Sequence, residues 1–220
     1  MAEIEHVERM RDHWWWRPGW QPGQHFYACH FSMSRHAELV RLVESYQASL
    51  AEFRTLDLIP AVWLHLTMQG IGFVDEVTDV ELSELRDLVQ RRLGALTPPT
   101  VTFHRPVVRP EAVYLPADPS EPIRSLRDVV RHAVAEVLGD DRVEQPARPP
   151  VEYRPHVSLA YSNAEQDAEP IAKALSEIHA EPVSLTLDHV DLLTFHRDRR
   201  MYEWTRAIPL SIGGGGSTRV

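Results

Sequence analysis

The sequence predicts a mixed fold of strands and helices built from two similar halves, residues 26–110 and 111–210. Apolar, β-branched runs typical of strands alternate with segments of helical periodicity along most of the chain. The order of these segments occurs twice. Each half carries the motif His-x-[Ser/Thr] near its middle and the tetrapeptide Thr-Phe-His-Arg near its end. The simplest arrangement packs the two halves about an approximate two-fold axis.

The elements of each half follow from periodicity and from helix-capping residues. In the first half we expect strands at 26–33, 61–70 and 100–108, and helices at 34–53 and 78–95, with Ser34 as the N-cap of the first helix. In the second half we expect strands at 111–116, 153–161, 182–196 and 201–210, and helices at 120–138 and 168–180. Ser120 precedes the helix at 120–138 and Gly139 follows it, as is typical of helix ends.

The two ends of the chain lie outside this repeat. Residues 1–25 form an arm that contains four of the six tryptophans, and Pro18, Gly19, Pro22 and Gly23 interrupt regular structure in it. Because an exposed cluster of tryptophans would be a large apolar patch, we expect the arm to pack against one half. A lid that stacks on bases and a segment that binds a partner are the alternatives. We expect a loop rich in Pro and Arg at 146–150, and a flexible glycine-rich tail at 211–220.

Charge and composition limit the function. A net charge of −9 disfavours a protein that coats duplex DNA, because nonspecific affinity comes from neutralising phosphates, but it is compatible with a local phosphate pocket. No apolar run is long enough to span a membrane, and the N-terminus has no signal-peptide pattern. Cys29 is the single cysteine, so no internal disulfide forms. We expect a cytoplasmic monomer.

The repeated motif places imidazoles and hydroxyls where they can act together. His65 and Thr67 share one face of a strand, as do His156 and Ser158, because strand side chains alternate. One histidine can accept a proton while the other donates one, and two hydroxyls can hold the oxygens of a phosphodiester. A hydrogen-bonded structural pair at a sheet edge is the alternative for each motif. His30-x-Ser32 has no counterpart in the second half, and we expect His30 to be structural.

The two motifs resemble those of the two-histidine (2H) phosphoesterase superfamily. "RPHVSLAY" is similar to that family's Pro-His-x-[Thr/Ser]-Leu-Ala signature, and the bacterial 2′-5′ RNA ligase-like and 2′,3′-cyclic phosphodiesterase branch matches best over residues 26–210. The resemblance implies a bilobal α+β fold with two antiparallel sheets flanked by helices and a central groove. It also implies metal-independent opening of a 2′,3′-cyclic phosphate to a 2′-phosphate, or the related 2′-5′ joining of RNA ends, with no cofactor.

The resemblance also assigns roles to the motif residues. It implies that His65 and His156 are the acid/base pair and that Thr67 and Ser158 hold the phosphate. For hydrolysis we expect His156 to activate water and His65 to protonate the leaving 3′ oxygen. Tyr161 departs from the family, since many relatives carry Arg at this position, and we expect it to be a substrate contact without a positive charge.

Three further residues are candidate substrate contacts. By strict alternation Trp63 and Gln69 share the face of His65, and Arg154 shares the face of His156. Trp63 is expected to stack on a base or to pack in the core, and Arg154 to contact phosphate or to be a solvated surface residue. We expect no metal site, because metal-like spacings such as His-Glu-x-x-His do not occur.

The sequence leaves two other functions open. The same fold can serve as a non-catalytic module that binds a nucleotide or an RNA end. A two-histidine phosphodiesterase can also act on ADP-ribose cyclic phosphate, a 2′-5′ oligonucleotide or another small phosphodiester. In each case the expected partner is an RNA end or a small nucleotide.

Overall fold

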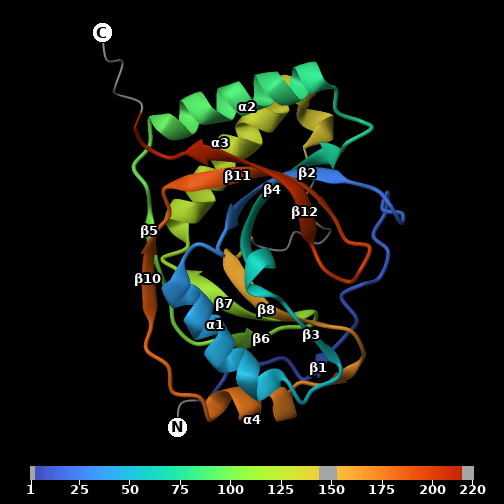
Figure 1. Cartoon of the computed structure of the whole chain (residues 1–220), viewed down its shortest axis with the longest axis vertical. Helices are drawn as coiled ribbons and strands as arrows, with labels where there is room; N and C mark the ends of the chain where they lie inside the picture. Colours follow the sequence, from blue (N-terminus) through green and yellow to red (C-terminus); the bar gives the residue numbers. More distant parts are fainter. Residues whose placement is uncertain (1–2, 144–152, 215–220) are drawn as a thin grey trace.

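Antiparallel strands form the centre of the molecule (Figure 1). The computed structural model describes residues 3–143 and 153–214. Ten strands make one sheet in the order β10-β5-β7-β8-β4-β2-β11-β12, with β3 beside β8 and β6 beside β7. One half of the sheet contains β2 (Phe26–Ser32), β4 (His65–Phe73), β11 (His189–His196) and β12 (Glu203–Ser211). The other contains β3 (Leu56–Leu58), β5 (Thr100–Phe103), β6 (Val107–Val108), β7 (Ala112–Asp118), β8 (His156–Ser162) and β10 (Val183–Thr186).

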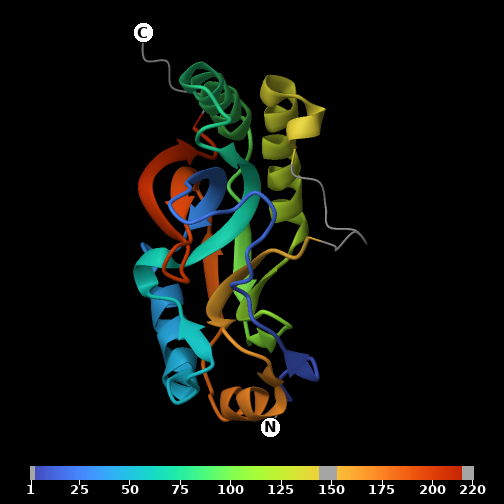
Figure 2. The same cartoon turned by 90° about the vertical axis from the view of Figure 1, so that its right-hand side faces the viewer.

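Four helices cover the two halves of the sheet. α2 (Asp79–Gly94) and α3 (Glu121–Leu138) lie side by side at the top of Figure 1, and α1 (Ala37–Leu50) and α4 (Glu169–Ser176) lie at the bottom. Figure 2 shows the same separation from the side. This is the bilobal α+β fold that the sequence predicts. The two expected sheets are continuous, because one residue pair, Leu66 with Val157, joins β4 to β8.

The repeated units exchange elements in space. β5, which follows the first motif in the chain, pairs with β7, and β11, which follows the second motif, pairs with β2. The helices cross in the same way, since α1 packs near β8 and α3 packs near β4. The approximate two-fold axis therefore passes close to the junction of β4 and β8.

Several element boundaries differ from the predicted ones. The first residues of the expected strand at 61–70 form a 3₁₀ turn, Ala61–Trp63, after Pro60, and β4 starts at His65. α1 begins at Ala37, and its N-cap is His36 rather than Ser34. The expected strand at 182–196 is broken at Leu187 and Asp188, because β10 pairs with β5 while β11 pairs with β2 in the other half of the sheet.

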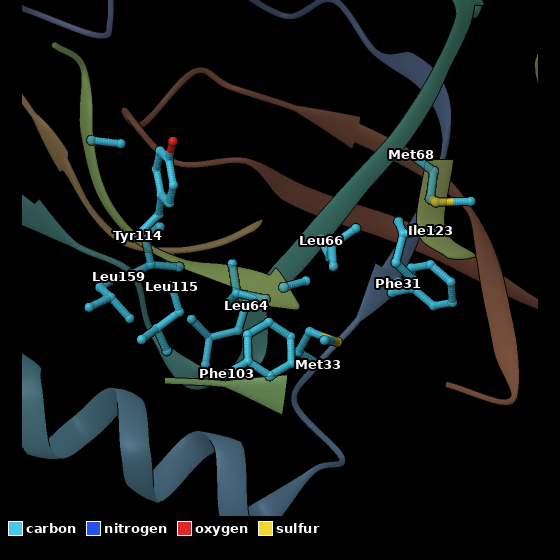
Figure 3. Close-up of a cluster of buried hydrophobic side chains, with 14 of the residues drawn as sticks. Phe31, Met33, Leu64, Leu66, Met68, Phe103, Tyr114, Leu115, Ile123 and Leu159 are labelled. Carbon is cyan, nitrogen blue, oxygen red and sulfur yellow. The ribbon is translucent and has the colours of Figure 1, made fainter. Parts of the chain in front are cut away.

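Apolar side chains from both halves pack into one core. Phe31 and Leu66, from β2 and β4, belong to the same buried cluster as Leu115 and Leu159, from β7 and β8 (Figure 3), and each of these four side chains is at most 2% exposed. Burial of one such side chain contributes ~1.5–3 kcal/mol. The contact between the two halves is therefore a substantial part of the stability of the fold.

The N-terminal arm packs against the sheet, as predicted. Its short strand β1 (Arg9–Met10) pairs with β9 (Gln166–Asp167), and the His13 N–H donates to the Ser162 carbonyl at 2.9 Å. Further along the arm, the ring of Trp20 packs within 6 Å of the rings of Phe26, Phe73 and Phe195.

Two predicted segments fall wholly or partly outside the described residues. The loop at 146–150 is one, and most of the tail at 211–220 is the other. Before residue 215, Ile212 is buried and the Gly213 N–H donates to the Leu93 carbonyl. Among the described residues, no helix combines the length and the apolar character that a membrane crossing requires.

The caps of α1 and α2 generate a stability prediction. Thr78 and Glu81 form a reciprocal capping box at the start of α2, whereas α1 has no side-chain cap bond. We expect Thr78→Ala to lower the free energy of unfolding by about 1 kcal/mol, and Thr78→Ser to lower it much less. Ser34→Ala, at the expected cap that the structure does not use, is the matched control. Urea denaturation measures all three, and equal losses for Thr78→Ala and Ser34→Ala would contradict the boundary assignment.

Candidate active site

The two repeated motifs meet where β4 and β8 run side by side. Leu66 pairs with Val157 in antiparallel register, and both side chains are fully buried. Antiparallel pairing at this position places His65 opposite Ser158 and Thr67 opposite His156. All four side chains leave the sheet on the face opposite to Leu66 and Val157. We call this face of β4 and β8 the site face.

Each motif histidine contacts the backbone carbonyl of the residue two positions before it. His65 Nδ1 lies 2.8 Å from the Trp63 carbonyl oxygen, and His156 Nδ1 lies 2.6 Å from the Arg154 carbonyl oxygen. An Nδ1–H that donates to the carbonyl two residues earlier leaves Nε2 as the free nitrogen of the neutral ring. Each imidazole therefore offers Nε2 for proton transfer and is fixed in orientation by its own strand.

An aromatic ring from the neighbouring strand stacks on each histidine. His30 lies parallel to His65 with 5.2 Å between ring centroids, and Tyr114 lies over His156 at 4.1 Å. The two positions are equivalent, because His30 pairs with Thr67 and Tyr114 pairs with Ser158. Figure 3 shows Tyr114 pointing away from the apolar cluster that contains Leu115. The sequence of the second half contains no motif that matches His30-x-Ser32. In the structure, however, Tyr114 occupies the position in the second half that His30 occupies in the first.

The two motif histidines differ in burial, and burial lowers the pKa of each. His65 is 8% exposed, and burial together with the nearby His156 lowers its pKa to about 4. Burial also lowers the pKa of His156, whose side chain is partly exposed. His30 is fully neutral near pH 7, because burial and the adjacent His65 lower its pKa to about 3.

β-bulges change which of the other predicted residues reach the site face. Met68 is an additional residue between the pairs His30–Thr67 and Cys29–Gln69, so Gln69 pairs with Cys29 on the opposite face. Gln69 is 1% exposed, and its amide donates to the Gly70 carbonyl. The prediction that Gln69 shares the face of His65 is therefore wrong, since strict alternation does not survive a bulge.

A bulge at Leu159 has the opposite effect on Tyr161. Leu159 is unpaired between Ser158 and Ala160, which turns the buried Tyr161 onto the site face, where its hydroxyl interacts with Ser158. Burial raises the pKa of Tyr161, so it remains a neutral hydroxyl. A hydrogen-bonding group thus stands where many relatives are expected to carry a cation.

Trp63 and Arg154 precede the two strands. The Trp63 ring meets the Trp204 ring edge to face at 4.8 Å, and Trp204 in turn lies 6.1 Å from His65. Arg154 is exposed, and its carbonyl oxygen is the partner of His156 Nδ1. Both therefore stay close to the motif histidines that their carbonyl groups orient.

Residues far apart in the sequence close one end of the site face. His13 stacks on Tyr161 at 4.2 Å, its Nε2 lies 3.0 Å from the Tyr202 hydroxyl, and Glu111 lies 3.3 Å from its Nδ1. Tyr202 meets His65 edge to face at 5.9 Å. This cover explains why His65 and Ser158 are buried while Thr67 is exposed.

These neighbours were not predicted from the sequence. His13 lies in the arm, Tyr114 in β7 and Tyr202 in the β11–β12 connection, and none of them belongs to a repeated motif. The dense tryptophans around His13 were the only sequence signal near them. Within the described ranges, no group of three or more His, Cys, Asp or Glu side chains is arranged to hold a metal ion.

Comparison with known proteins identifies the family of the chain and solved structures with a similar fold. The family described as the 2′-5′ RNA ligase superfamily matches residues 36–199, and no curated protein matches the chain. The fold is similar to that of TT0787 of Thermus thermophilus, with a TM-score of 0.61 and 22% identity over 87% of this chain and 99% of that one. It is also similar to E. coli LigT crystallised with NADP+ (TM-score 0.54, 16% identity, 85% and 98% covered) and with 3′-AMP (0.52, 18%, 86% and 99%). The match over residues 36–199 and the paired histidine motifs it contains show that the chain belongs to the 2′-5′ RNA ligase superfamily of two-histidine phosphoesterases.

Proposed function

We propose that the chain is a phosphoesterase that opens a 2′,3′-cyclic phosphate at an RNA end or on a nucleotide and leaves a 2′-phosphate. The observation that carries the proposal is the pair of histidines on one face, each with Nδ1 held by a carbonyl and Nε2 free. Water attacks phosphorus as one Nε2 takes its proton, and the bond to the 3′ oxygen breaks as the other Nε2 protonates that oxygen. The same steps, with a 5′ hydroxyl attacking phosphorus in place of water, join RNA ends through a 2′-5′ linkage, and the 3′ oxygen leaves with the proton from the second Nε2.

The hydroxyls of Thr67 and Ser158 complete the site. Because each lies opposite the histidine of the other strand, the two can donate hydrogen bonds to the non-bridging oxygens of a phosphate held between the histidines. Two proton-transfer groups and two donors account for the reaction without a metal ion. The crystal structure of the similar E. coli LigT with 3′-AMP supports a nucleotide ligand for this fold.

We propose that His65 is the base and His156 the acid. Because the pKa of His65 is lowered to about 4, its ring is neutral near pH 7 and can accept the proton of water. His156 is partly exposed, so a protonated ring costs less there than at the buried His65, and we assign the proton of the pair to it. This division is opposite to the one expected from the sequence, and the leaving-group experiment below distinguishes the two.

Replacement of either histidine tests catalysis directly. We expect His65→Ala and His156→Ala each to lower kcat/KM for a 2′,3′-cyclic nucleotide by about 10²- to 10⁴-fold, with EDTA present throughout, because each removes one proton transfer. His104→Ala is the matched control, since this exposed histidine of the first Thr-Phe-His-Arg lies outside the site. Full activity in both site variants, or its loss on chelation in the wild type, would contradict the proposal.

The pKa shifts predict an acidic optimum. The profile of kcat/KM against pH reports the free enzyme, in which one histidine must be neutral and the other protonated. Activity should fall below about pH 4, where the base becomes protonated, and should also fall as the pH rises through the pKa of the acid, which lies below the ordinary 6.5. Both values belong to the coupled pair. A bell centred above pH 7 would contradict this prediction.

The nature of the leaving group separates the acid from the base. A p-nitrophenyl phosphodiester releases a stable anion that needs no proton, so loss of the acid should matter much less for it than for the cyclic nucleotide. For each variant we compare the ratio of its kcat/KM to that of the wild type on the two substrates. For His156→Ala this ratio should be at least about tenfold higher on the nitrophenyl substrate than on the cyclic nucleotide. For His65→Ala it should be the same on both. The reverse pattern would assign His65 as the acid.

Two alternatives share the same site. A binding module would hold a cyclic nucleotide tightly and release it unchanged. A phosphodiesterase for ADP-ribose 1″,2″-cyclic phosphate or for 2′-5′ dinucleotides would turn over those substrates in preference to RNA ends. A panel of these compounds under one set of conditions distinguishes the three functions.

A further inference from the structure

Of the four tryptophans of the arm, one is buried, one is partly buried and two are exposed. Trp14 is 9% exposed and Trp20 is packed among phenylalanines, but Trp15 is 48% and Trp16 is 51% exposed. Among the large apolar side chains in the described part of the chain, they are the only exposed aromatic ones. Trp14 and Trp20 therefore anchor the arm, whereas Trp15 and Trp16 contribute little to the core.

A guanidinium lies against each exposed indole. Arg17 is 5.7 Å from the ring centroid of Trp15, and Arg197 is 5.9 Å from that of Trp16. Arg197 is itself 4% exposed and donates to the carbonyls of His13 and Trp15. Cation–π contact on one side of an indole holds the ring in place and leaves its other side for a ligand.

The backbone around the two indoles is fixed on both sides. The Asp12 carboxylate accepts the Trp14 N–H at 2.9 Å, the Trp14 indole N–H donates to Asp57 at 2.9 Å, and the Trp20 N–H donates to the Arg17 carbonyl at 3.1 Å. A surface that is ordered before a ligand arrives loses less conformational entropy on binding. The exposed pair is therefore a preorganised aromatic surface.

This surface is connected to the proposed active site through a short series of contacts. Arg197 lies 5.7 Å from the Tyr202 ring centroid, and Tyr202 lies 5.9 Å from His65. Trp14 also touches Tyr202, at 5.6 Å between centroids. The exposed indoles therefore border the covered end of the site face, beside the His65 motif.

We propose that Trp15 and Trp16 form a stacking subsite for bases of single-stranded RNA upstream of the terminal nucleotide whose phosphate lies between His65 and His156. This inference rests on the proposed function and specifies its substrate as an oligonucleotide end rather than a free nucleotide. Every base has an aromatic face, so the subsite holds bases without reading their sequence. Arg17 is the partly exposed cation beside this surface, and it lies 3.4 Å from the Glu111 carboxylate, whereas the buried Arg197 supports Trp16 from within.

The size of the surface favours RNA over a protein partner. A stable protein interface buries about 800 Å² on each side, whereas the exposed aromatic surface here consists of two adjacent indoles flanked by arginine. The stacking of one base on one aromatic side chain changes affinity by roughly 5- to 150-fold. Two indoles are therefore enough to distinguish an oligonucleotide from a mononucleotide.

Substrate length tests the subsite. With the full-length protein, kcat/KM is measured for a 2′,3′-cyclic mononucleotide and for a tetranucleotide that ends in the same cyclic phosphate. We expect the wild type to prefer the tetranucleotide. In the double variant Trp15→Ala/Trp16→Ala, the loss should be at least about tenfold larger for the tetranucleotide than for the mononucleotide, and Trp15→Phe/Trp16→Phe should retain most of the preference. For a tetranucleotide that lacks the upstream bases, kcat/KM should be the same for the wild type and for both double variants.

Equal losses on both substrates, or an unchanged preference in the alanine variant, would overturn the inference. Calorimetric titration with a tetranucleotide that ends in a 3′-phosphate provides a readout without turnover. If the wild type hydrolyses no cyclic phosphate, the proposed function fails, while weaker binding of this ligand to the alanine variant still supports the subsite. Equal binding by wild type and variant overturns the subsite, whatever the activity.

Discussion

The pairing of Leu66 with Val157 is the contact on which the rest of the structure depends. It joins the two halves of the sheet, and because it is antiparallel it places the histidine of each motif opposite the hydroxyl of the other. A slip of one residue would turn the motif side chains of one strand into the core. The two buried apolar side chains thus specify the register, and the register creates the site.

The backbone of the site is nearly symmetric, but its surroundings are not. Both histidines donate to the carbonyl two residues before them, and both are stacked by the neighbouring strand. Only His65, however, is covered by Tyr202 and, through it, by His13 of the arm. Burial lowers the pKa of the covered histidine to about 4. A duplicated unit can therefore place two chemically identical groups in different surroundings, which is the asymmetry that the proposed division into acid and base uses.

The sequence predicts the fold class and the pairing of the motifs, since periodicity and repetition record which residues face the core. It does not predict what depends on single bulges or on the exchange of strands. The bulge at Met68 turns Gln69 away from the site face, and the bulge at Leu159 turns Tyr161 onto it. Tyr114 and Tyr202 reach the histidines from elements outside the motifs, because β7 and the β11–β12 connection are brought there by pairing across the repeat.

The arm links the acidic composition of the chain to its proposed substrate. With a net charge of −9, the protein gains little affinity for RNA from general attraction to phosphates. Stacking on indoles does not depend on net charge, and the guanidinium groups of Arg17 and Arg197 hold those indoles in place through cation–π contact. Recognition of this kind is local. It favours a strand end that reaches both the aromatic pair and the histidines over any long stretch of nucleic acid.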